Sequence, residues 1–206
     1  MMFPSASYSK RKRSVHPALL LSLMMFLLGS AMITATAESA DSGFQPVITV
    51  DNTVLSLRGT GRLRWKGLIK VYDLGLYLPQ DLPSTDVFTD APKRLEFHYS
   101  VEIRAKDFGE AAAPYLDKNV PPDELKKLQN RITAINGLYR DVKSGDRYTL
   151  TYLPGKGTEL AWNGTILGVI DGADFAGAYF RIWLGEHPIS ESMRRSLLQP
   201  PKDSGR

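Results

Sequence analysis

The sequence predicts a single α+β domain, in which a mostly antiparallel sheet is covered on one face by a layer of helices. Short runs rich in β-branched and aromatic residues recur along the chain and are separated by turn residues. Helical periodicity appears in two blocks between these runs. The chain contains no cysteine, so an apolar core and not disulfide bonds has to stabilise it.

The N-terminal segment has the pattern of a signal peptide. Residues 10–13 are Lys-Arg-Lys-Arg, residues 18–28 are almost entirely apolar, and Ala35-Thr36-Ala37 matches a cleavage site. A membrane-spanning helix needs about 20 apolar residues, and this run is shorter. The pattern predicts a cleaved signal peptide at residues 1–37 and a periplasmic or secreted protein with no membrane span after cleavage.

Removing this leader changes the charge of the chain. Of 26 basic and 22 acidic residues, four basic ones and no acidic ones lie in residues 1–37. The remainder is therefore balanced, which argues against a nucleic-acid partner. Two histidines remain, His98 and His187, and they lack metal-ligand spacing. We predict no cofactor and no metal; the oligomeric state stays open.

Seven strands are predicted in the remaining chain, within a domain at residues 38–199 and before a disordered tail at 200–206. They cover residues 47–50, 54–64, 68–78, 95–103, 148–153, 159–162 and 166–170. The sequence Pro154-Gly155-Lys156-Gly157 predicts a turn between the fifth and sixth strands. Leu150, Tyr152, Leu160 and Trp162 are expected to be partners across that hairpin.

Helices are predicted at residues 106–115, 121–139, 171–184 and 190–198. Prolines at the start of the second suit a first helical turn. We interpret Asp171 as the N-cap of the third helix, with Asp174 completing a capping arrangement, in preference to a catalytic carboxylate pair. Gly185 is expected to end that helix.

The loop between the second and third strands decides which side chains share a face. A three-residue loop, Trp65-Lys66-Gly67, would place glycine where a left-handed conformation is needed. Thr60 would then lie opposite Tyr72. A two-residue turn at Lys66-Gly67 would put Arg64 and Tyr72 on opposite faces.

With the three-residue loop, three cations and a phenol share one face, where they are predicted to hold an anion. These residues are Arg62, Arg64, Lys70 and Tyr72. The alternative interpretation is an ordinary solvent-facing sheet surface, where arginine and lysine are common. Gly59-x-Gly61 opens a strand and lacks a third spaced glycine, so no dinucleotide site is expected.

Two segments together resemble the chalcone-isomerase-like family, in particular its secreted bacterial branch. The first contains Gly59-Thr60-Gly61 and continues to Lys70-Val71-Tyr72, and the second covers residues 179–188, Tyr-Phe-Arg-Ile-Trp-Leu-Gly-Glu-His-Pro. The resemblance implies an α+β fold with helices over one face of an antiparallel sheet. This expectation agrees with the periodicity.

The resemblance also has implications for function. In chalcone isomerases an arginine after the early Gly-x-Gly holds the substrate's phenolate, and a threonine on the next strand helps stabilise the enolate. In the fatty-acid-binding branch a tyrosine replaces that threonine and holds a carboxylate together with the arginine. Arg64 corresponds best to this arginine, with Arg62 as the alternative, and Tyr72 occupies the second position.

The resemblance therefore implies a binding protein for a small amphipathic anion, a fatty acid or a phenolic acid, in a cleft between sheet and helices. One alternative is an intramolecular lyase, an isomerase acting on a chalcone-like enone. Another is a non-enzymatic periplasmic partner protein. The helix-borne residues of the enzymes have no local motif here, although Tyr115, Tyr139, Asn130 and Asn136 lie in the corresponding region.

Overall fold

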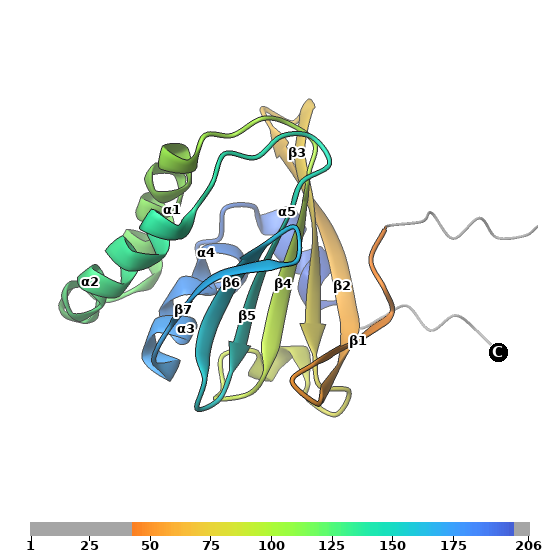
Figure 1. Cartoon of the computed structure of the whole chain (residues 1–206), viewed down its shortest axis with the longest axis vertical. Helices are drawn as coiled ribbons and strands as arrows, with labels where there is room; N and C mark the ends of the chain where they lie inside the picture. Colours follow the sequence, from red (N-terminus) through yellow and green to blue (C-terminus); the bar gives the residue numbers. More distant parts are fainter. Residues whose placement is uncertain (1–42, 200–206) are drawn as a thin grey trace, which may run out of the picture. The chain divides into compact units, whose positions relative to one another are not determined.

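The computed structural model describes residues 43–199 of the chain. Seven strands form one sheet in which each strand pairs antiparallel with its neighbours in sequence (Figure 1). They are β1 Val47–Val50, β2 Thr53–Trp65, β3 Ile69–Leu78, β4 Lys93–Tyr99, β5 Arg147–Leu153, β6 Gly157–Trp162 and β7 Thr165–Ile170. The predicted α+β class is confirmed. The predicted leader and C-terminal tail lie outside the described residues.

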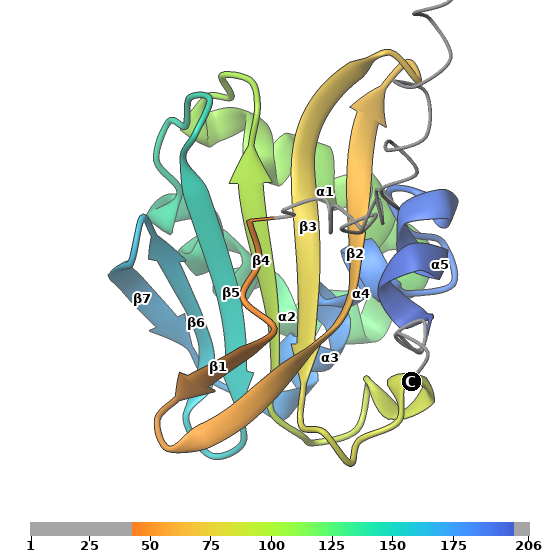
Figure 2. The ribbon, with the colours of Figure 1, turned by 90° about the vertical axis from the view of Figure 1, so that its right-hand side faces the viewer.

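Five α-helices and one 3₁₀ turn accompany the sheet. They are the turn at Ser84–Asp86, α1 Ala105–Asn119, α2 Pro122–Leu138, α3 Ala173–Tyr179, α4 Arg181–Leu184 and α5 Glu191–Leu198. Figure 2 shows α1 to α4 behind the sheet, α5 beside β2, and β1 crossing the opposite face. Between residues 43 and 199, no helix combines the length and the apolar character that crossing a membrane requires.

Alternation along the strands divides the core between the two faces of the sheet. On the helix-covered face, Leu74, Leu76 and Leu78 of β3 are fully buried. A smaller cluster contains Phe44, Leu55 and Tyr77, with Phe44 coming from the segment before β1. Burying the larger cluster against the helices supplies most of the hydrophobic stabilisation of the fold.

The two early glycines allow α5 to lie directly against β2. A Cβ atom added to Gly59 would lie 2.4 Å from the carbonyl oxygen of Ser196, and one added to Gly61 would lie 2.6 Å from Cγ of Met193. No side chain fits between strand and helix at these positions. The Gly-x-Gly motif of this chain is therefore explained by close backbone packing.

The predicted helix from Asp171 differs from the observed one. It is divided into α3 and α4, its N-cap is Gly172 at φ 101°, and no side chain caps it. The Asp174 carboxylate instead accepts two hydrogen bonds from Arg131 of α2, at 2.7 and 2.6 Å, and the Asp171 carbonyl accepts a third at 2.9 Å. The capping interpretation was wrong because a bidentate guanidinium holds the Asp174 carboxylate and a glycine starts the helix. Gly185 does end α4, as predicted.

Candidate functional site

The β2–β3 pairing places the predicted anion cradle differently from the sequence-based expectation. Leu63, and not Thr60, lies opposite Tyr72, and the register shifts by one residue between Leu63 and Arg64. Lys66 and Gly67 both have positive φ, 49° and 73°, as in a type I′ turn. The predicted loop was wrong because Lys66 adopts a left-handed conformation that we had assigned to glycine alone.

This register separates Tyr72 from the cations. Successive residues of a strand point to opposite faces. Tyr72 shares its face with Leu63, whereas Arg62 and Arg64 point to the other side. The register shift leaves Val71 without a partner, so Lys70, paired with Arg64, lies with the cations beside Asp73. The prediction that Arg62, Arg64, Lys70 and Tyr72 share one face is wrong.

Two of the cations are instead bound to a carboxylate. Asp73 accepts from Nε of Arg62 at 2.6 Å and lies 2.7 Å from Nζ of Lys70. Partial burial raises the pKa of Asp73, but its hydrogen bonds with Arg62 and Lys70 outweigh this effect and lower that pKa. The guanidinium of Arg64 reaches the Leu68 carbonyl at 3.5 Å. Of the four predicted residues, Tyr72 lines a partly open pocket between sheet and helices, and its role in ligand binding stays a prediction.

That pocket lies between the helix-covered face of the sheet and helices α1 and α4, with a cavity volume of about 140 Å³. Tyr72 and Tyr99 form its sheet wall, Phe108 and Ala111 come from α1, and Trp183 comes from α4. The lining includes neither arginine nor lysine. We refer to this cavity as the aromatic pocket.

Tyr72 presents an unused hydrogen-bond donor within the aromatic pocket. Nε1 of Trp183 donates to the Tyr72 oxygen at 3.1 Å, and an indole nitrogen can only donate. Among the described residues, no hydrogen bond is donated by the Tyr72 hydroxyl. Burial raises the pKa of Tyr72 far above its usual value, although the bond from Trp183 opposes this. The group therefore stays a neutral phenol that can donate to a ligand.

Two further tyrosines, Tyr139 after α2 and Tyr179 of α3, also line the aromatic pocket. The rings of Phe108 and Tyr139 stack at 4.5 Å, and the hydroxyls of Tyr139 and Tyr179 are hydrogen-bonded at 3.0 Å. Burial raises the pKa of Tyr139 well above its usual value and that of Tyr179 to about 12. Tyr139, which the sequence could not assign, thus belongs to the pocket lining.

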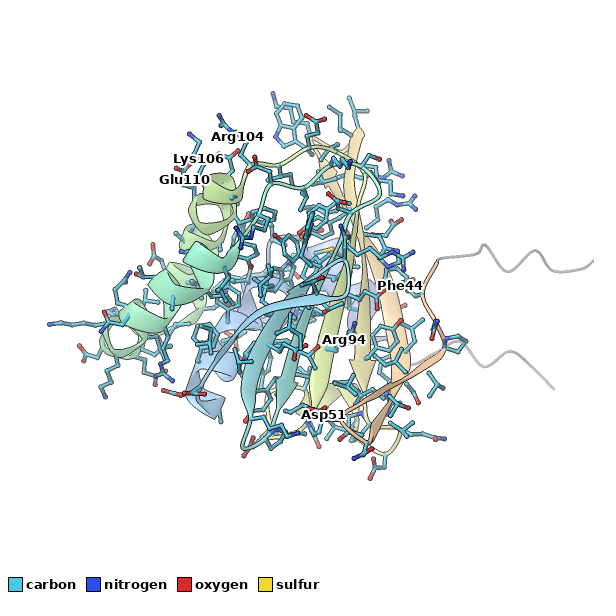
Figure 3. The ribbon with its side chains drawn as sticks, viewed as in Figure 1. Phe44, Asp51, Arg94, Arg104, Lys106 and Glu110 are labelled. Atoms are coloured by element: carbon cyan, nitrogen blue, oxygen red, sulfur yellow. The ribbon has the colours of Figure 1, made fainter. Side chains whose placement is uncertain are left out.

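Asp107 is the one charged residue among those that line the aromatic pocket. It lies in the first turn of α1 and accepts two hydrogen bonds from Arg104, at 3.0 and 3.2 Å. Arg104 and Lys106 are exposed at the same end of α1, where Figure 3 labels them. Arg104 is thus neutralised by Asp107, and Lys106 is an exposed cation beside the pocket that forms no salt bridge with a described residue, close to the exposed Glu110.

Sequence reasoning missed a buried lysine on the neighbouring strand. Lys93 is 2% exposed, its Nζ donates to the Thr89 carbonyl at 2.8 Å, and it lies 5.0 Å from the centre of the Tyr152 ring. Burial lowers the pKa of Lys93 to about 8. The signal was present, because Lys93 lies two residues before Leu95, on the same face of β4 as the inward-facing Leu95 and Phe97.

An open groove of about 800 Å³ lies near this lysine, and its lining includes Asp90, Asn119, Tyr152 and Arg181. The Asp90 carboxylate accepts a hydrogen bond from Tyr152. The groove is much wider than the aromatic pocket and mixes charges of both signs. Among residues 43–199, no group of three or more His, Cys, Asp or Glu side chains is placed to hold a metal ion.

Comparisons with known proteins agree with the fold. A family model described as chalcone isomerase-like matches residues 36–199. The crystal structure of a fatty-acid binding protein from Arabidopsis thaliana superimposes with a TM-score of 0.59 at 18% sequence identity, over 75% of this chain and 90% of that one. No curated protein sequence gives a significant match. At this identity the structural similarity establishes a shared architecture.

Proposed function

Because this chain belongs to the chalcone isomerase-like family, we propose that it binds a small amphipathic molecule, with a fatty acid as the first candidate. The observation that carries the proposal is the aromatic pocket, which combines apolar walls with the unused donor of Tyr72. Such a combination is typical of small-molecule sites. The ligand of the Arabidopsis thaliana protein with the same architecture supports the choice of a fatty acid.

The size of the aromatic pocket limits the part of the ligand that it encloses. Its volume is about 140 Å³, whereas pockets for drug-sized ligands start at about 300 Å³. An apolar protein cavity of about 150 Å³ accommodates benzene. The pocket therefore holds about six carbons of a hydrocarbon chain, or the single ring of a phenolic acid.

The charge of the lining determines where an acidic head group lies. An ionised carboxylate inside the pocket would be desolvated without a cation beside it, at a cost of several kcal/mol. We therefore place the carboxylate outside the pocket, near the exposed Lys106, since Arg104 is already paired with Asp107. The Tyr72 hydroxyl is left for neutral acceptors such as an alcohol or an ester.

The lining and the open volume of the aromatic pocket disfavour the two alternatives, a lyase and a partner protein without a ligand. A lyase acting on a chalcone-like enone gains much of its rate from a cation that holds the phenolate, and the lining contains neither arginine nor lysine. A partner protein without a ligand would be expected to fill the space with its own side chains. The open volume of the pocket favours a ligand.

A chain-length series tests the proposal. Calorimetric titration with saturated fatty acids should show affinity increasing about fourfold for each added carbon, because each buried methylene contributes about 0.8 kcal/mol. The increase should stop near six buried carbons. A single-ring phenolic acid tests the second ligand class in the same assay.

Two variants on α1 control for binding elsewhere. Ala111 is exposed and lines the aromatic pocket, so Ala111→Phe should block the opening and abolish binding. Ala113 is also exposed but lines a separate hollow between α1 and α2, so Ala113→Phe should leave binding unchanged. If neither ligand class binds, or if Ala111→Phe binds as well as the original chain, the proposal is wrong.

The proposal includes export, on the basis of the leader pattern at residues 1–37. Mass spectrometry of the protein isolated from its own host should show an N-terminus at Glu38 in the periplasm or the medium. A cytoplasmic protein that retains residues 1–37 would contradict export without affecting the ligand proposal.

A further inference from the structure

The tip of the β2–β3 hairpin exposes three large apolar side chains. Trp65 is 56% exposed, Leu68 82% and Ile69 48%. Trp65 and Ile69 are directly paired across the hairpin, and the Leu68 amide closes the turn by donating to the Trp65 carbonyl at 3.1 Å. The ordered turn therefore keeps these apolar side chains exposed to water, where no burial contributes to their stability.

Positive charge surrounds this tip. Residues 62–70 contain four cations and no acidic residue. Arg62 and Lys70 are paired with Asp73, whereas Arg64 and Lys66 form no salt bridge with any described residue. Nζ of Lys66 lies 4.5 Å from the centre of the Trp65 ring. An apolar tip beside unneutralised cations is complementary to a partner that has an anionic surface over an apolar interior.

The extent of the tip distinguishes a lipid surface from a protein partner. Three side chains, two of them about half buried, offer far less than the roughly 800 Å² per partner that a stable protein interface buries. Insertion into a bilayer interface has no such minimum, and tryptophan is enriched at that depth. Arginine and lysine near the surface are attracted to anionic head groups.

We propose that the β2–β3 hairpin tip docks this protein on an anionic lipid bilayer, with Trp65, Leu68 and Ile69 inserted and Arg64 and Lys66 at the phosphate level. The aromatic pocket lies close to this tip, since Leu63 and Val71 line it from the two strands of the same hairpin. Docking does not depend on the pocket having a ligand.

The test uses a chain starting at Glu38, because the apolar leader would itself bind lipid. The described core lies entirely within residues 43–199, so this chain retains it. Vesicles of phosphatidylglycerol mixed with phosphatidylcholine should sediment the protein and shift its tryptophan emission to the blue. Vesicles of phosphatidylcholine alone should bind it much more weakly.

Matched variants separate the tip from the remaining surface. Leu68→Asp should weaken binding about tenfold or more, because an apolar side chain is replaced by a charge. Arg64→Gln and Lys66→Gln should each weaken it about fivefold. Ile166→Asp on β7 and Lys126→Gln on α2 change an exposed apolar residue and an exposed lysine elsewhere, and should leave binding unchanged.

The substituted residues are exposed, and cooperative thermal unfolding monitored by circular dichroism verifies that each variant folds. Failure of the original chain to bind anionic vesicles would overturn the proposal. So would equal binding by Leu68→Asp, or a concentration-dependent dimer that Leu68→Asp dissociates while vesicles are ignored. The last outcome would assign the tip to a second copy of this chain.

Discussion

Leu63 lies directly opposite Tyr72 in the β2–β3 pair, and Arg64 points to the other face of the sheet. A one-residue difference in register therefore exchanges a leucine for an arginine beside the phenol. The wall of the aromatic pocket is apolar at the position where an anion-binding site would need a cation. Ligand selectivity should depend on this pair more than on any other.

We expect Arg64→Ala to leave the affinity for a pocket ligand within about twofold of the original value. Arg64 contributes no atom to the pocket, and charges exposed on the opposite face are screened by solvent. The titration with fatty and phenolic acids measures this directly. A large loss of affinity would show that Arg64 contacts the ligand.

Leu63→Arg should convert the pocket into a carboxylate site. The half-buried side chain would place a guanidinium beside the Tyr72 hydroxyl, and hydrogen bonds to charged groups contribute about 1.5–3 kcal/mol. The ratio of affinities for a fatty acid and for the alcohol of equal length should rise at least tenfold. The Arg64→Ala titration serves as the reference, and an unchanged ratio would show that position 63 does not face the ligand.

Tyr72→Phe should lower the free energy of unfolding by about 1–3 kcal/mol. The substitution leaves the buried Trp183 indole N–H without its acceptor, and an unsatisfied buried donor costs about that much. Urea unfolding of Tyr72→Phe, Trp183→Phe and the double variant separates the hydrogen bond from lost packing. Additive effects of the two single substitutions would argue against this hydrogen bond.

Gly59→Ala should destabilise the protein by about 1–3 kcal/mol, because its Cβ would meet the backbone of α5 at 2.4 Å. Gly137 in α2 is the matched control. It is exposed and no atom lies within 4 Å of an added Cβ, so Gly137→Ala should stabilise by about 0.5–1 kcal/mol. Thermal unfolding of the two variants should shift in opposite directions.

The stability of the protein should increase with pH between about pH 8 and pH 10. Burial lowers the pKa of Lys93 from 10.5 to about 8, so the folded state releases this proton first as the pH rises. In that window the unfolded state binds more protons, which raises the free energy of unfolding by up to about 3 kcal/mol. The buried tyrosines oppose this trend only above pH 10.0, where unfolded phenols begin to ionise.

Lys93→Met isolates that contribution. The variant keeps a long apolar side chain but cannot ionise, so its urea unfolding should lack the increase between pH 8 and pH 10. At neutral pH it should be as stable as the original chain or more so, because a buried charge is removed. If the free energy of unfolding of Lys93→Met still increases between pH 8 and pH 10, titratable groups other than Lys93 cause the increase.

The strands and helices were predictable because their patterns are local. Alternation and turn residues located all seven strands. Leu150 pairs with Leu160 as expected, whereas Tyr152 pairs with Thr158 and Trp162 with Tyr148. Strand β4 runs from Lys93 to Tyr99, whereas the prediction placed it at residues 95–103 and left Lys93 outside it. The alternation of β4 also predicts that Lys93 faces inward with Leu95 and Phe97, but this inward-facing lysine was missed.

The site was less predictable because it depends on geometry between elements. The face on which Tyr72 lies depends on the hairpin loop, and the loop depends on whether Lys66 adopts a left-handed conformation. Lysine rarely adopts this conformation, so the sequence does not indicate it. The partner of Asp174 lies on α2, far along the chain, so a local capping interpretation could not find Arg131. The tyrosines of the pocket come from β3, β4, the residue after α2 and α3, and no spacing motif relates them.

The order of the strands in the sheet has a consequence for how the protein folds. Every strand pairs with its neighbour in sequence, so β5, β6 and β7 can assemble through short loops. Pairing β4 with β5 instead has to close the long stretch from Ser100 to Asp146, which carries α1 and α2. Loop-closure entropy makes that step slow unless the two helices have first packed together. The rate-limiting event should therefore be the docking of this helical insertion onto the sheet, the same event that closes the aromatic pocket.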